Sequence, residues 1–108
     1  MNEGEELLAL HLAELGVAFT RQCAYAVGRK MRADFGLPAE RILIEVQGGI
    51  YSKQKQGHSS ISGILADLAR LNLATINNWR MMRFTPDQIA SGEAKLTIVL
   101  AIEKGETA

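Results

Sequence analysis

One carboxylate interrupts the most apolar segment of the chain. The run Ile42-Leu43-Ile44-Glu45-Val46 is rich in β-branched residues, and Gly48-Gly49 follows, so residues 41–47 predict a strand that packs into a core. A charge inside such a strand is costly unless an opposite charge or a metal ion compensates it. The simplest interpretation is a cross-strand ion pair between Glu45 and Arg32, and the alternative is a metal site.

The remaining pattern predicts one domain, residues 1–108, with an α/β fold and a central mixed sheet flanked by helices in the order α-β-β-β-α-β-α-α. The helix expected at 60–77 has aliphatic residues at three- and four-residue steps along one stripe. Thr85-Pro86-Asp87-Gln88 carries the signals of a helix start, and Gly92 ends that helix. Helices are also expected at 3–15 and 94–104, and strands at 17–26, 29–36, 41–47 and 79–84.

Composition excludes several classes of protein. The only cysteine, Cys23, cannot form an internal disulfide, and it suits the core of an intracellular protein. No apolar run is long enough to span a bilayer, and the acidic N-terminal segment lacks the basic start of a secretory signal. We therefore expect a cytoplasmic protein without a membrane partner. The 12 basic and 12 acidic residues cancel, but residues 17–83 hold ten of the basic ones and four of the acidic ones, which suits a phosphate-contacting face.

Alternation along the two central strands brings polar side chains together. If residues 29–36 and 41–47 pair antiparallel about a turn at 37–40, Asp34 lies opposite Leu43 and Arg32 lies opposite Glu45. Asp34 and Glu45 are then diagonal neighbours on one face, and Gln47 shares that face. Two carboxylates so placed suit Mg²⁺ or Mn²⁺, either of which can polarise a phosphodiester and activate water. Gln47 is no strong base, but it can orient water or a phosphate oxygen.

Several motifs together resemble one family, the very-short-patch-repair-like (Vsr-like) endonucleases of the restriction-endonuclease-like PD-(D/E)XK superfamily, with close relatives in phages and prophages. The resemblance covers about residues 4–93. It implies a restriction-endonuclease-like core and Mg²⁺-dependent cleavage of DNA in a bacterial host cell. The motifs are Arg32-Ala33-Asp34-Phe35, Ile44-Glu45-Val46-Gln47-Gly48-Gly49, His58, and Asp67…Asn72…Trp79-Arg80…Arg83-Phe84-Thr85.

The resemblance assigns roles to individual residues. It implies that Asp34 and Glu45 are metal ligands, joined by an acid of the first helix, for which Glu5 fits the spacing best and Glu6 is the alternative. The residue two after the glutamate is usually Lys in this family, and here it is Gln47. His58 would serve as a general acid/base or contact the scissile phosphate.

Basic residues near the expected site are candidates for contacts with DNA phosphates, although each is alternatively a solvated surface charge. We predict a metal-dependent endodeoxyribonuclease. The absent Lys leaves open a catalytically weak nuclease-fold module for DNA binding or assembly, and a junction- or mismatch-specific nuclease is a third possibility. A nuclease with one site often works as a homodimer. The candidate DNA contacts are Arg29, Lys30, Arg32, Lys53, Lys55, Arg80 and Arg83.

Overall fold

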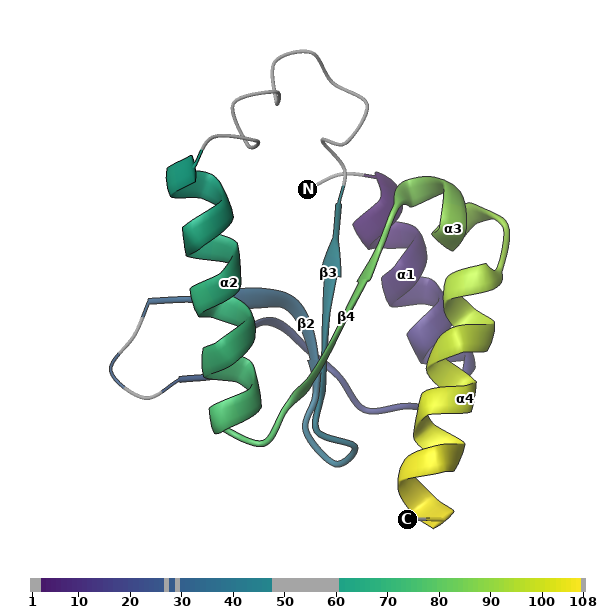
Figure 1. Cartoon of the computed structure of the whole chain (residues 1–108). Coiled ribbons are helices and arrows are strands. Elements are labelled where there is room, and N and C mark those ends of the chain that lie inside the picture. Colours follow the sequence, from purple (N-terminus) through teal and green to yellow (C-terminus); the bar gives the residue numbers. More distant parts are fainter. Residues whose placement is uncertain (1–2, 27, 29, 48–60, 108) are drawn as a thin grey trace.

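A computed structural model of the chain describes residues 3–26, 28, 30–47 and 61–107. It is an α/β structure in which helices flank a four-stranded mixed sheet with the strand order β1-β2-β3-β4 (Figure 1). The predicted order of helices and strands is confirmed, including a helix at the C-terminal end. Among these residues, no helix is long and apolar enough to cross a membrane. The elements are α1 (Glu3–Glu14), β1 (Thr20–Ala24), β2 (Arg32–Leu37), β3 (Ile42–Val46), α2 (Ile61–Ile76), β4 (Arg80–Phe84), α3 (Pro86–Ala90) and α4 (Glu93–Thr107).

Local hydrogen bonds explain where α1 ends and where α3 begins. Gly16 follows α1 in the left-handed conformation, with φ of 71°, and the amides of Gly16 and Val17 donate to the carbonyls of Ala13 and Leu12. These two bonds form the Schellman motif that glycine favours at a helix end. At the start of α3, Thr85 and Gln88 cap each other reciprocally, as the sequence predicts.

The sheet separates two hydrophobic cores, and β3 contributes side chains to both. This strand pairs antiparallel with β2 and parallel with β4, which the chain reaches by crossing over through α2. Ile42 and Ile44 are buried on the face that α1, α3 and α4 cover, whereas Leu43 belongs to the smaller cluster on the opposite face, where α2 lies (Figure 1). The alternation of these side chains is what assigns Glu45 to the α2 side of the sheet.

The register between β2 and β3 differs from the predicted one by two residues. Phe35 pairs with Ile44, and Leu37 pairs with Ile42, so the turn covers residues 38–41 instead of 37–40. Arg41 closes this turn in the left-handed conformation, with φ of 57°, and its guanidinium lies 3.9 Å from the centre of the Trp79 ring. A positive φ is uncommon for a side chain of this size, which is why the sequence does not reveal the longer turn.

A shift of two residues keeps Phe35 and Leu37 on their predicted face, where they lie in one core with Ile42 and Ile44, because faces alternate with a period of two. The alternation along β2 is interrupted at Asp34, since Ala33 lies in the α2-side core with Leu43. The predicted pairing of Asp34 with Leu43 is wrong, because Gly36 pairs with Leu43, and with this register Arg32 does not lie opposite Glu45.

Gly36 allows a close approach between β1 and β2. A Cβ atom at Gly36 would lie 2.3 Å from Sγ of Cys23 and 2.6 Å from its Cβ, well inside contact distance. Cys23 is a buried member of the α2-side core, as predicted. The absence of a side chain at Gly36 therefore makes room for Cys23.

We expect Gly36→Ala to lower the free energy of unfolding by about 1–3 kcal/mol, the usual cost of overpacking a core. Urea denaturation followed by circular dichroism measures this loss. In a Cys23→Gly background, which removes both clashing atoms, the same substitution should cost clearly less. An equal cost in the two backgrounds would contradict the proposed clash.

Candidate functional site

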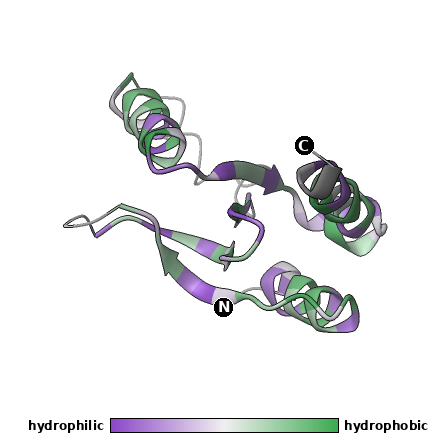
Figure 2. Cartoon of the chain, turned by 90° about the horizontal axis from the view of Figure 1, so that it is seen from below, coloured by the Kyte–Doolittle hydropathy of each residue, from purple (hydrophilic) through white to green (hydrophobic). Residues whose placement is uncertain are grey.

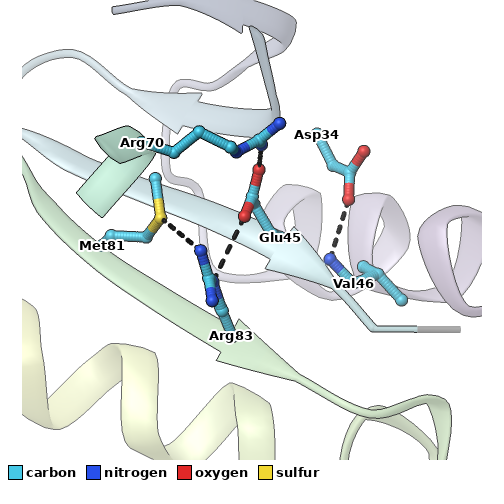
Figure 3. Close-up of polar contacts among 6 residues, drawn as sticks. All are labelled: Asp34, Glu45, Val46, Arg70, Met81 and Arg83. Atoms are coloured by element: carbon cyan, nitrogen blue, oxygen red, sulfur yellow. Dashed lines mark hydrogen bonds and ion pairs between the residues drawn. The ribbon is translucent and has the colours of Figure 1, made fainter. Parts of the chain in front are cut away.

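Glu45 is the only charged residue that is buried among those described, and two arginines compensate it (Figure 3). Arg83 stands beside it in the parallel register of β3 and β4, with Nε 3.3 Å from Oε1 of Glu45. Arg70 reaches it from α2 and donates a hydrogen bond to Oε2. An ion pair therefore compensates Glu45 as the simplest interpretation predicts, but not with Arg32, which donates to the carbonyl of Gln22 instead.

The two arginines leave this part of the site with a net positive charge. Each guanidinium is only partly exposed, with 29% of the Arg70 side chain and 27% of the Arg83 side chain accessible. Nε of Arg70 is buried and has no hydrogen-bond partner within the described part of the chain.

Asp34 lies where β2 and β3 cease to pair. Its Oδ2 accepts a hydrogen bond of 2.7 Å from the backbone amide of Val46, so the side chain replaces a bond of the sheet (Figure 3). The carboxylates of Asp34 and Glu45 thus flank the carboxyl end of β3 while each is held by different partners. This end of the sheet is also where the chain leaves β3.

Glu5, at the start of α1, is the acid of this helix whose pKa the charge of Asp34 affects. The pKa of Glu5 is raised, first because the group is partly buried and next because Asp34 repels its charge, while Arg21 opposes the shift. Nη2 of Arg21 lies 3.8 Å from Glu5 and donates to Glu6 at 2.8 Å. This hydrogen bond with Arg21 lowers the pKa of the exposed Glu6. Of the two candidate acids, Glu5 therefore belongs with Asp34.

Arg21 and Arg70 are the residues of this site that the sequence analysis did not identify. The guanidinium of Arg21 also stacks over the ring of Phe35, 5.1 Å from the ring centre, and its pKa is raised mainly by its hydrogen bond with Glu6. Arg21 stands in no motif, and only the pairing of β1 with β2, which sets it opposite Phe35, reveals its position.

A basic cavity adjoins Glu45. It has a volume of about 610 Å³, is open to solvent, and is lined by Lys30, Arg32 and Arg70 together with Gln22 and Met31. Two of these cations, Lys30 and Arg32, are predicted DNA contacts, and the third is the partner of Glu45. Because Arg70 belongs to both, the cavity and the carboxylate are parts of one continuous site.

The other predicted residues are distributed differently. Arg80 donates to the carbonyls of Ala101 at 3.0 Å and Glu40 at 3.3 Å, so its guanidinium connects β4 to α4 and to the turn before β3. The Gln47 side chain is exposed, and its backbone amide donates to the carbonyl of Phe84 at 2.8 Å. Arg29, Lys53, Lys55 and His58 lie outside the described residues.

The carboxylates fit a divalent cation only in part. Within residues 3–26, 28, 30–47 and 61–107, no group of three or more His, Cys, Asp or Glu side chains is arranged to hold an ion. Glu5 and Asp34 fit in chemistry, since they offer the hard oxygens that Mg²⁺ prefers and their mutual repulsion would be relieved by a cation. Glu45 could join them only if one of its arginines moved away.

We expect Asp34→Asn to lower the pKa of Glu5, because the substitution removes the like charge while burial still favours the protonated acid. Arg21→Gln should raise the same pKa, because it removes an opposing charge. Titration of the side-chain carboxyl carbons by NMR measures both shifts. Shifts of equal sign, or no shift in either variant, would contradict the proximity of these three groups.

The raised pKa also has a consequence for stability. A carboxyl group whose pKa is higher in the folded state than in the unfolded state favours folding when it is protonated, so the contribution of Glu5 is present at low pH and is lost as the pH rises through its folded pKa. In its charged form Glu5 therefore lowers the free energy of unfolding, and a bound cation would reduce this loss.

Comparison of the chain with protein-family models, with curated proteins and with solved structures finds no match.

Proposed function

We propose that the chain is a metal-dependent endodeoxyribonuclease with a restriction-endonuclease-like core. The observation that carries the proposal is the position of Asp34 and Glu45, which flank the end of β3 beside a cavity lined by three cations. Acids that can bind a cation and bases that can bind phosphate are the two components that phosphodiester hydrolysis requires. An enzyme of this kind acts on intracellular DNA, so we place it in the cytoplasm of a bacterial host, with a phage or prophage as a source that the resemblance supports.

Each group has a defined task in this proposal. Asp34 and Glu5 supply oxygen ligands for Mg²⁺ or Mn²⁺, with Glu45 as a further ligand once an arginine releases it. The bound ion would polarise the phosphodiester and lower the pKa of an attacking water. Lys30 and Arg32 hold the phosphate backbone in the cavity, and Gln47 orients water or a phosphate oxygen. His58 keeps its proposed role in proton transfer.

A second candidate function follows from the pairing of Glu45. Two guanidinium groups already neutralise its charge, and Gln47 stands where the resemblance expects Lys. A chain that used these arginines only as structural partners would be a nuclease-fold module for DNA binding or assembly, with little activity of its own.

We expect the purified chain to nick supercoiled plasmid in the presence of Mg²⁺ or Mn²⁺. Asp34→Asn and Glu45→Gln should each lower the rate by roughly 100-fold or more, because each removes a charge that stabilises the reaction. Gel electrophoresis of the plasmid over time measures the rate, and circular dichroism verifies that each variant is folded.

Glu14→Gln provides the matched control, because Glu14 is an exposed acid at the opposite end of α1 from Glu5 and pairs with Lys95 on α4. Its rate should equal that of the unchanged chain. Nicking that survives both substitutions at Asp34 and Glu45 would exclude these residues as the site. Metal-independent binding of duplex DNA without any nicking would favour the second function, and a panel of mismatched and junction substrates tests whether cleavage depends on DNA structure.

A further inference from the structure

The α2 helix turns its apolar stripe away from the sheet. Of its residues only Ala74 is buried, and Leu73 is partly buried against the sheet, whereas its six other large aliphatic side chains are between 42% and 77% exposed. Figure 2 shows that hydrophobic residues make up much of this helix. Arg70 projects from the opposite side of the helix toward Glu45. No described residue covers the stripe. Exposure of so many neighbouring aliphatic side chains is unusual. The stripe consists of Ile61, Ile64, Leu65, Leu68, Leu71 and Ile76.

The spacing within the stripe suits another helix. Ile61, Ile64, Leu68, Leu71 and Thr75 follow one another at alternating steps of three and four residues. This is the spacing of the seam along which two helices pack side by side. The seam contains no charged residue. A membrane surface would call for Lys or Arg along the borders of the stripe, and the one basic residue of α2, Arg70, instead pairs with Glu45.

The amount of exposed surface points to a stable partner. Six aliphatic side chains exposed to this degree present on the order of 600 Å² of apolar surface, which is at the upper limit for a monomeric protein. A stable interface takes roughly 800 Å² from each partner. The exposed neighbours Ala69, Asn72 and Thr75 extend the stripe toward that area.

We propose that this stripe, along α2, is the interface of a homodimer in which α2 packs against α2 of a second copy. The six side chains of the stripe carry no charge, and Asp67, which is exposed at the border of the stripe, stays at the solvated rim of the interface. Two-fold dimers with identical contact surfaces are the commonest assemblies of identical chains. The two-fold axis passes near the middle of the stripe, at Leu68. Contact along this face leaves the side of α2 that carries Arg70 free to face Glu45.

A dimer of this form carries two candidate sites, one on each outer half. If the proposed function holds, two sites related by a two-fold axis match the two antiparallel strands of a DNA duplex. The dimer itself does not depend on that function, because it is measured without DNA or metal. Failure of one proposal therefore leaves the other open to its own experiment.

Sedimentation velocity of the full chain at micromolar concentration tests the dimer. We expect a mass about twice 11.8 kDa for the unchanged chain, and dissociation to the monomer for Leu68→Glu, with the dimer weakened by roughly 100-fold or more because each copy would bury an unpaired charge. Leu10→Glu is the matched control, since Leu10 on α1 is 56% exposed and Leu68 is 55% exposed. The control should remain a dimer.

A cysteine variant excludes misfolding as the cause of dissociation. In a Cys23→Ser background, Leu68→Cys should give a disulfide-linked dimer on mild oxidation, because a residue on the two-fold axis meets its own copy. The double variant Leu65→Cys with Leu71→Cys should also cross-link, because the same axis sets Leu65 opposite Leu71 of the second copy. A cysteine at Leu10 should not. A monomeric unchanged chain, a dimer indifferent to Leu68→Glu, or no more cross-linking along α2 than at Leu10 would each overturn the proposal.

Discussion

The pairing of Glu45 with Arg70 and Arg83 determines how the parts of this structure fit together. A carboxylate that is 7% exposed cannot remain charged without partners, and here the partners come from two other elements, α2 and β4. The interaction thereby joins the central strand to the parallel strand beside it and to the helix that connects them. Removing either the acid or both arginines would leave a charge without compensation at the junction of all three elements.

The same interaction explains the unusual orientation of α2. Arg70 and the apolar stripe lie on opposite sides of the helix, so a helix that directs Arg70 to Glu45 must direct the stripe outward. Leu73 and the small side chain of Ala74 complete the contact with the sheet. The outer face of α2 thus carries more apolar surface than its inner face, the reverse of an ordinary surface helix.

The sequence predicts the elements, their order and the face of the main core residues of β2 and β3, because these follow from local periodicity. The predicted register is wrong by two residues, and periodicity does not reveal that the alternation of β2 is interrupted at Asp34. The sequence does not predict the partners of Glu45. Arg70 lies 25 residues further along the chain and meets Glu45 only through the crossover, which no local pattern encodes. Likewise, periodicity reveals the stripe on α2 but not what it packs against.

The balance of charge gives the candidate site a further property. Acids and bases are mixed around the end of β3, where Glu5, Asp34 and Glu45 stand with Arg21, Arg70 and Arg83. Glu6 beside Arg21, and Lys30 and Arg32 in the cavity, border this group. A divalent cation bound alone would add positive charge next to the arginines, and a phosphate bound alone would add negative charge next to the acids. Each ligand offsets the charge that the other brings, so under the proposed function metal and DNA phosphate bind more favourably together than either does alone. Arg70, which contacts Glu45 and lines the phosphate cavity, is the residue through which that coupling would act.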